Sequence, residues 1–330
     1  MPRSEFVPLL GVLSDIHPLR PVSKQVQPML NPHPLSPAGF EPAGGRPLLE
    51  VQTYSGGRQS EWLLESYRRG ERRIRNADSF VVINSGPGME RTTTRLRVAR
   101  MESRCLEAGI DFRRAPGPNL YTDLLDLHAG EKNRIDNPPF WVHNADGTRG
   151  KLQHNCTREY KIRPMRRMMR QVLFERWGIP VGPRGNHALR PNAVRIQIGF
   201  SAGESSRIKP PRDDDPAWCE LVYPLVEAGV TDDVVAAVYR RWGISPPDIS
   251  MCNGCPFQGL RNLRSMSAAD IQQTITVDRV IRDLSAAGVK RPAYVSDTLI
   301  PMAELAEQEF STGDEVTDDM HQCTSGVCFA

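Results

Sequence analysis

The sequence predicts an α/β protein with a doubly wound, mostly parallel sheet and a helical, cysteine-bearing C-terminal extension. Two observations carry this prediction. Short apolar runs alternate with amphipathic runs from residue 48 onward, and a Ser-Gly-Gly turn separates the first apolar run from the first amphipathic one. Such alternation is typical of parallel sheets covered by helices on both faces. A chain of 330 residues with 39% apolar and 25% charged residues is long enough for one large or two medium soluble domains.

Residues 1–47 hold about ten of the 28 prolines and show no sustained periodicity. This pattern predicts an extended, largely disordered leader. The sequence shows no membrane span, and its first apolar run is too short and too broken by proline for a secretory signal. We therefore expect a cytoplasmic protein whose cysteines are reduced thiols or metal ligands.

The first half of the predicted sheet follows the leader directly. "LLEVQTY" and "SFVVINSG" read as buried strands, and "SEWLLESYRRG" between them reads as a helix that stops at Gly70. "ERTTTRLRVARMESRCLEAG" predicts a second helix ending at Gly109, and "IDFRRAP" predicts a third strand. Residues 115–155 read as a long irregular insertion, which in compact domains is often a functional lid.

Further elements follow the insertion. "PMRRMMRQVLFERWG" predicts a helix with Pro164 in its first turn and Gly178 just past its end, whose methionines pack in the core. "AVRIQIGF" is the fourth predicted strand. "TDDVVAAVYRRWG" predicts a helix capped by Thr231, and residues 268–310 hold one or two more helices before a loop-like tail.

The turn "SGGRQS" at residues 55–60 predicts an anion site. A turn that opens a helix exposes unpaired backbone N–H groups at the positive end of the helix dipole, and glycines allow an anion to come close. In parallel sheets, ligands bind beyond the carboxyl ends of the strands, which is where this turn lies. An ordinary strand-to-helix turn is the alternative interpretation.

Seven cysteines are the other chemical signal. Cys252 and Cys255 lie two residues apart in a Pro/Gly-rich turn, a spacing that suits a metal, an iron-sulfur cluster or a redox dithiol. Cys105 and Cys219 are expected to be buried small hydrophobes. The remaining candidates are Cys156, Cys323 and Cys328.

Five motifs occur in a fixed order: "TYSGGRQS", "INSGPGMER", "NCTREYKIRPM", "IGFSAGESSR" and "ISMCNGCPF". Together they resemble the phosphoadenosine-phosphosulfate (PAPS) reductase branch of the PP-loop ATP-pyrophosphatase superfamily, whose fold is adenine nucleotide alpha hydrolase-like, in its phage and actinobacterial type. The resemblance implies a PP-loop nucleotide-binding domain at residues 48–265, preceded by the leader at 1–47 and followed by the C-terminal extension at 266–330.

The resemblance also implies site residues. An adenine nucleotide (PAPS, adenylyl sulfate or ATP) would bind the residues that match the PP-loop and two acidic positions: Ser55, Gly56, Gly57, Arg58, Gln59, Ser60, Glu90 and Glu204. The residues implied in catalysis are the nucleophile and two phosphate- or sulfate-neutralising cations: Cys323, Lys161 and Arg207. A 4Fe-4S cluster, with zinc as the alternative, would take four cysteine ligands: Cys156, Cys252, Cys255 and Cys328.

The sequence departs from the family at several of these positions. Gln59 replaces the aspartate of the loop, which puts a Mg²⁺ role there in doubt, and Asn84 stands where an aspartate is expected. Cys323 lacks the histidine that follows the reductase nucleophile, and Cys156 follows Asn155 instead of a second cysteine.

Three functions therefore stay open. The first is a sulfonucleotide reductase, supplied with electrons by a thioredoxin-like partner. The second is an ATP-using sulfur transferase acting in DNA phosphorothioation or in tRNA or base thiolation, whose arginine-rich segments at 68–75 and 163–170 contact a phosphate backbone. The third is a zinc-stapled nucleotide-binding module without catalysis.

Overall fold

A computed structural model describes residues 47–72, 77–134, 138–180, 182, 189, 191–211, 215–247, 250–258, 260–284 and 291–311. The chain divides into two units, residues 1–31 and 32–330, and all described residues belong to the second unit. The predicted leader, apart from residue 47, lies outside the described residues. Cys323 and Cys328 in the predicted tail also lie outside them.

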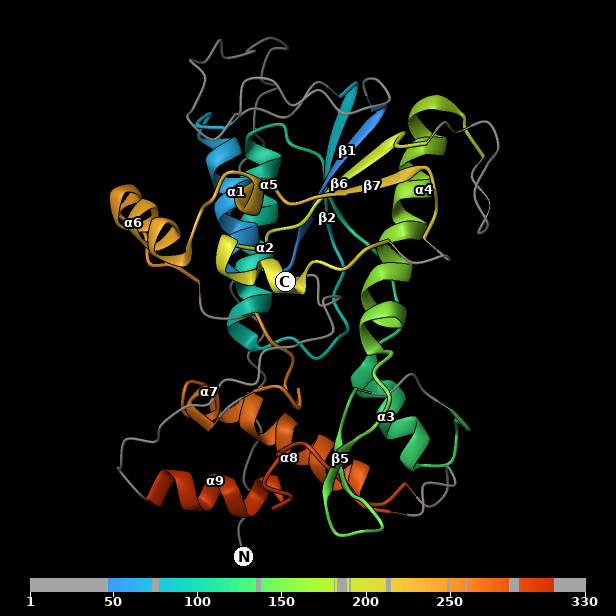
Figure 1. Ribbon diagram of the computed structural model, residues 1–330, viewed down its shortest axis with the longest axis vertical. Coiled ribbons are helices and arrows are strands. Elements are labelled where there is room, and N and C mark those ends of the chain that lie inside the picture. The colour runs from blue at the N-terminus through green and yellow to red at the C-terminus, as the bar shows by residue number, and fades with distance from the viewer. Residues whose placement is uncertain are drawn as a thin grey trace, which may run out of the picture. The chain divides into compact units, whose positions relative to one another are not determined.

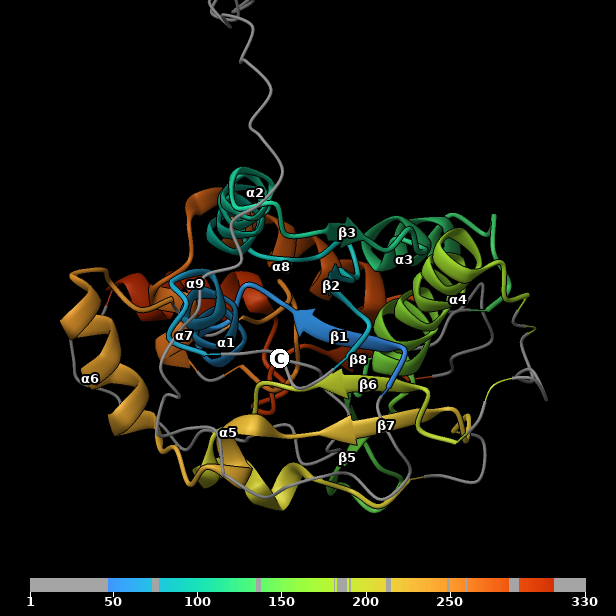
Figure 2. The same cartoon turned by 90° about the horizontal axis from the view of Figure 1, so that it is seen from above.

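Five parallel strands form the central sheet, in the order β3-β2-β1-β6-β7 (Figure 2). Their bounds are Leu49–Tyr54 for β1, Ser79–Asn84 for β2, Phe112–Arg114 for β3, Val194–Gln197 for β6 and Cys219–Val222 for β7. The chain builds the sheet outward from β1 in one direction and then from β6 in the other. The predicted fold class is therefore confirmed, and the carboxyl end of β1 lies at the point where the strand order reverses.

Helices cover both faces of this sheet (Figure 1). On one face lie α1 (Arg58–Arg68) and α2 (Thr92–Glu107), and the other is covered by α4 (Arg163–Trp177). Two further helices, α5 (Pro224–Glu227) and α6 (Asp232–Trp242), pack against α1. Each helix predicted for this half is present. α4 and α6 end where the sequence indicated, because Gly178 and Gly243 adopt the left-handed conformation there.

The core of the sheet has the residues that the periodicity predicted. The apolar side chains of α4 are buried against β1, β2 and β6, as expected for its methionines: Met165, Met168, Met169, Val172 and Leu173. On the opposite face, Cys105 is fully buried with Tyr54 and Val98, which confirms its predicted role as a small hydrophobe.

The insertion at residues 115–155 is more regular than predicted. It contains α3 (Leu120–His128) and the hairpin of β4 (Trp141–His143) and β5 (Arg149–Lys151). The prediction of an irregular segment was wrong because β4 completes its pairing with β8 (Ala293–Tyr294), about 150 residues later in the chain. A strand whose partner is that distant leaves little local pattern.

The C-terminal helices share a hydrophobic core with this insertion. α7 (Leu260–Arg264), α8 (Ala268–Arg282) and α9 (Met302–Ser311) follow one another, and α8 packs against both α3 and α9. Asp278 of α8 accepts hydrogen bonds from the backbone N–H groups of Val295 and Met302, so one carboxylate positions the segment that leads to α9. Within the described residues, no helix has an apolar stretch of the length that crossing a bilayer requires.

Candidate active site

The turn at residues 55–60 joins β1 to α1 as predicted. Gly56 adopts φ of +77°, a conformation that an L side chain rarely takes. The hydroxyls of Ser55 and Ser60 lie 3.2 Å apart, and the backbone N–H of Gly57 donates to Ser55 Oγ at 3.3 Å. Gly57 is the N-cap of α1 and has no side chain to cap it, so this helix begins in the way that suits a bound anion.

Two segments from elsewhere in the chain press against this turn. A Cβ atom on Gly199, just after β6, would lie 2.8 Å from the backbone nitrogen of Ser60. A Cβ atom on Gly57 would lie 3.1 Å from Cβ of Ser250, whose hydroxyl donates to the carbonyl of Ser55 at 2.8 Å. Sequence reasoning missed Gly199 and Ser250. Gly199, the first glycine of "IGFSAG", is the kind of residue that a close backbone approach requires.

The two residues that distinguish this turn from the family pattern both have partners. Arg58 Nε donates to the carbonyl of Pro247 at 3.3 Å, and Gln59 Nε2 donates to Oδ1 of Asp232 at 3.0 Å. Asp232 belongs to the first turn of α6. The aspartate missing at position 59 is thus matched by a carboxylate from another helix, beside the same turn.

Glu90 lies in the loop after β2, and its backbone lies beside that of the cysteine motif. Glu90 and Cys252 form an isolated antiparallel bridge, and the backbone N–H of Asn253 donates to the carbonyl of Met89 at 2.6 Å. The Glu90 carboxylate turns back toward Gly88, whose N–H donates to it at 3.4 Å. Because Ser250 contacts the 55–60 turn, the segment from Ser250 to Cys252 spans from that turn to the loop of Glu90.

Asp270 holds this arrangement in place from α8. It accepts hydrogen bonds from Asn253 Nδ2, from the backbone N–H and hydroxyl of Thr92, and from the Ser267 hydroxyl. Burial alone raises the pKa of Asp270, but the hydrogen bonds from Asn253, Ser267 and Thr92 outweigh burial and leave the pKa lowered. One ionised carboxylate thereby joins α8, the start of α2 and the cysteine motif.

The cysteine-bearing segments approach one another. The N–H of Cys255 donates to the carbonyl of Cys252 at 3.1 Å, so the pair occupies a tight turn. The ring of His154, two residues before Cys156, lies 6.0 Å from the ring of Phe257 between centroids. Both segments therefore border the same part of the protein.

The predicted metal site is not assembled by these residues alone. Among the residues that the structure describes, no three His, Cys, Asp or Glu side chains form a group that could hold a metal ion. The fourth predicted ligand, Cys328, lies outside the described range, as does the predicted nucleophile Cys323. A 4Fe-4S or zinc site at Cys156, Cys252, Cys255 and Cys328 stays a prediction.

Glu204 and Arg207 lie beyond the carboxyl end of β6, in the short helix Ala202–Arg207. Glu204 caps this helix by accepting from the N–H of Ser201 at 3.0 Å, and it also forms an ion pair with Arg207. The guanidinium of Arg207 lies over the ring of Phe200, 4.3 Å from its centroid. The structure thus brings the two residues together, with the arginine charge balanced by its neighbour.

Lys161 lies in a π-helical turn, Arg158–Ile162, that leads into α4. The start of α4 is at the carboxyl edge of the sheet, because a Cβ atom on Gly117, just after β3, would meet the Pro164 ring. Lys161 and the 55–60 turn therefore lie at the same edge of the sheet. The role of Lys161 toward phosphate or sulfate stays a prediction.

The arginine-rich segment at 68–75 is engaged within the protein as far as it is described. Arg68 and Arg69 both pair with the buried Glu65. Arg72 is buried and donates to the side-chain oxygens of Gln52 and Gln197. These three arginines stabilise α1 and the sheet, and this part of the segment does not offer a free surface to a phosphate backbone.

Comparison with known proteins shows a similarity among solved structures only. No family model matches the sequence, and none of the curated proteins matches it. Among solved structures, the chain is similar to the U34-tRNA thiolase NcsA from Methanococcus maripaludis with its 4Fe-4S cluster. The two are 12% identical over 84% of this chain and 77% of that chain, with a TM-score of 0.36. Values this low establish no shared function.

Proposed function

We propose that this protein is an ATP-dependent sulfur transferase that acts on a nucleic acid or one of its bases. The enzyme would adenylylate an oxygen of the acceptor and release pyrophosphate. A persulfide on one cysteine, loaded by a sulfane-sulfur donor, would then displace AMP from the activated carbon and form a disulfide between acceptor and cysteine. The thiol of the second cysteine would cleave that disulfide, leaving sulfur on the acceptor and a cysteine disulfide that an external dithiol reduces. The observation that carries the proposal is the contact of the cysteine segment with the 55–60 turn. The Ser250 hydroxyl donates a hydrogen bond to the carbonyl of Ser55. Two residues later, the backbone of Cys252 forms an antiparallel bridge with the backbone of Glu90.

The turn supplies what the phosphates of ATP require. Backbone N–H groups at the start of α1 and the guanidinium of Arg58 would face the pyrophosphate, at the point where the strand order reverses. The Asp232 carboxylate beside Gln59 could take the place of the loop aspartate toward a Mg²⁺ ion. A cysteine on the segment that contacts the turn would then deliver sulfur to the adenylylated acceptor before that intermediate leaves the protein.

A sulfonucleotide reductase is the second candidate. It is favoured by the retained pair of Glu204 and Arg207 at the carboxyl edge, which could orient a sulfonucleotide. Its nucleophile would be Cys323, and its electrons would come from a thioredoxin-like donor. For the first candidate, the described residues bring the segment that precedes Cys252 to the 55–60 turn through Ser250. The nucleophile of the second candidate lies in the part of the chain not described.

The test is anaerobic incubation of the full chain with ATP, adenylyl sulfate or PAPS, each with and without total RNA or DNA. Pyrophosphate, sulfite and adenosine bisphosphate are measured, together with sulfur incorporated into the nucleic acid from a labelled sulfane-sulfur donor. We expect pyrophosphate from ATP only, stimulated by nucleic acid. Cys252→Ser and Cys255→Ser should abolish sulfur incorporation, while Cys323→Ser should retain it.

Two other results would change the assignment. Sulfite release that disappears in Cys323→Ser would replace the proposal with the reductase. If no product forms from any of the three nucleotides, in protein that still binds ATP, the protein is a nucleotide-binding module without catalysis.

A further inference from the structure

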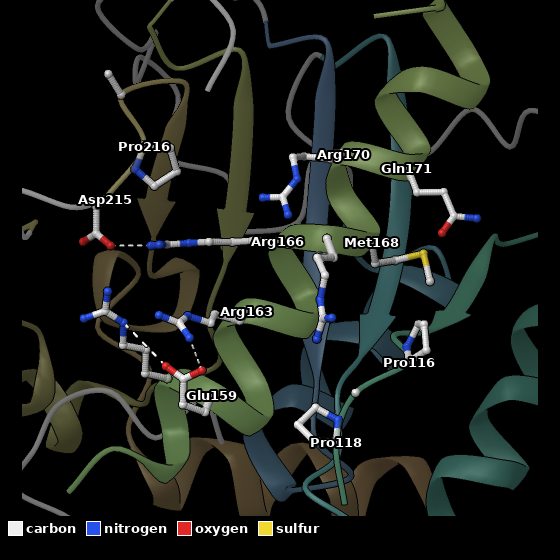
Figure 3. A pocket seen from close by; sticks show the side chains of 14 residues that line it. Pro116, Pro118, Glu159, Arg163, Arg166, Met168, Arg170, Gln171, Asp215 and Pro216 are labelled. Carbon is white, nitrogen blue, oxygen red and sulfur yellow. Dashed lines mark hydrogen bonds and ion pairs between the residues drawn. The ribbon is translucent and has the colours of Figure 1, made fainter. Parts of the chain in front are cut away.

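A groove runs along the outer side of α4, with a volume of about 1320 Å³ (Figure 3). Its walls are the π-helical turn and α4 on one side, the Pro116–Pro118 segment after β3, and the segment from Asp215 to Ala217 before β7. Five arginines line it: Arg158, Arg163, Arg166, Arg167 and Arg170. Only two acidic side chains share the lining, so the groove is strongly positive.

The two acidic residues leave part of this charge unbalanced. Glu159 pairs with Arg163, and Asp215 pairs with Arg166 (Figure 3). Within the described part of the chain, neither Arg167 nor Arg170 is paired with a carboxylate. Partial burial, together with the neighbouring charges of Arg167 and Arg166, lowers the pKa of Arg170. Like charges held this close favour a bound anion.

An exposed aromatic ring continues the line of arginines. Arg163, Arg167, Arg170 and Phe174 are spaced by four, three and four residues, so they follow one face of α4. Phe174 is 61% exposed, whereas Met165, Met168, Met169, Val172 and Leu173 of this helix are buried in the sheet core and Trp177 packs against that core half-buried. The line is about 16 Å long, which is enough to span several consecutive phosphates of a nucleic-acid backbone.

The groove begins at the edge of the sheet where the 55–60 turn lies. Pro164 and Gly117 meet at the carboxyl end of the strands. At the other end of α4, Arg176 donates to Ser79 and to the carbonyl of Phe80, at the start of β2. A polyanion lying in the groove would therefore extend from the carboxyl edge of the sheet, which also carries the 55–60 turn, toward the opposite edge.

We propose that this groove binds a single-stranded segment of nucleic acid, with phosphates on Arg167 and Arg170 and a base stacked on Phe174. Arginines that follow the backbone and an aromatic ring that stacks with a base are the two elements of single-strand binding. The inference rests on the proposed function in one respect, because the bound strand would be the acceptor of sulfur.

The experiment measures fluorescence anisotropy of labelled 12-nucleotide RNA, DNA of the same sequence and the corresponding duplex, bound to the full chain without ATP. Single strands should bind more tightly than the duplex, and inorganic tripolyphosphate should compete only at much higher concentration. Comparison of the RNA and DNA strands shows which nucleic acid is preferred. If tripolyphosphate competes as well as an unlabelled single strand does, the groove is a polyphosphate site and the proposal is overturned.

Two variants and their controls test the named residues. R167E/R170E should weaken single-strand binding at least tenfold, whereas R100E/R240E, which changes net charge equally on exposed arginines of α2 and α6, should not. R167A/R170A should reduce the slope of log K against log salt by about 1.4. Phe174→Ala should weaken binding about tenfold. Leu106→Ala, at a site that is 79% exposed on α2, should leave binding unchanged.

The outcomes separate this inference from the proposed function. Equal losses in R167E/R170E and R100E/R240E, or wild-type binding by R167E/R170E and Phe174→Ala, would overturn the groove assignment. If pyrophosphate release from ATP is observed in that case, the proposed function stands alone. Binding that depends on the groove in a protein that releases no pyrophosphate would overturn the proposed function instead.

Discussion

Replacing Asp270 should loosen the cysteine motif and destabilise the protein together. Its carboxylate accepts from Thr92, Asn253 and Ser267, and it is 2% exposed. In Asp270→Asn one amide oxygen remains for these donors, so at least one of them loses its acceptor. An unsatisfied buried donor costs about 1–3 kcal/mol. In Asp270→Ala all of them lose it, and we expect a decrease of about 3 kcal/mol or more in the free energy of unfolding.

The pH dependence of this effect has a definite sign. The pKa of Asp270 is lowered in the folded state, so the carboxylate stabilises the protein above the unfolded-state pKa of about 4. This stabilisation is lost as the pH falls through the folded-state pKa. The difference between wild type and Asp270→Asn should be complete at pH 7 and shrink below about pH 4.

Urea unfolding at several pH values measures both effects, and Asp233→Asn in an exposed turn of α6 is the matched control. The control should change stability by no more than about 0.5 kcal/mol. If the loss in Asp270→Asn equals that of the control, or stays constant from pH 7 to pH 3, Asp270 does not act as an ionised acceptor.

Three further predictions concern single residues. Burial raises the pKa of the Cys105 thiol to about 12, so a disulfide reagent at pH 8 should modify Cys105 only when the protein unfolds; rapid modification in native protein would contradict its burial. Gly199→Ala should displace the 55–60 turn and abolish binding of a fluorescent ATP analogue, because its methyl group would lie 2.8 Å from the Ser60 nitrogen. Gly203→Ala, whose nearest neighbour is at 3.9 Å, is the control, and equal ATP affinity in the two variants would refute the role of Gly199. Burial, partly offset by Arg97, the Tyr54 hydrogen bond and Arg104, leaves the pKa of Glu61 raised, so ionised Glu61 lowers stability at neutral pH. Glu61→Gln keeps an acceptor for Tyr54 and should therefore be more stable than wild type at pH 8, with a gain that shrinks as the pH falls below the raised pKa; a gain independent of pH would show a cause other than ionisation.

Elements with strong local patterns could be predicted from the sequence. The apolar run of β1 and the glycine after α4 each depend on residues within one element. β7 was missed because it is a partly exposed edge strand in which Cys219 and Glu220 interrupt the apolar pattern. The hairpin of β4 and β5 was missed because its third strand comes from the distant β8.

The candidate site divides in the same way. Ser55, Gly56 and Gly57 carry a recognisable motif, and their turn has the expected place at the end of β1. Asp232, opposite Gln59, carries no such signal, because its role depends on how α6 packs against α1. Asp270 reads from the sequence as an ordinary first-turn acid of α8, and only the fold brings Asn253 and Thr92 to it.

The contact between Ser250 and Ser55 has a consequence for how the protein is made. These residues are 195 positions apart, whereas the hydroxyl contact within the turn joins residues only five apart. A growing chain has made all five strands of the central sheet once Val222 is complete, before Ser250 has been synthesised. Non-local contacts also form late because closing a long loop costs entropy. The turn would thus be open during synthesis, and a cell would gain a complete site only after the cysteine segment closes over it.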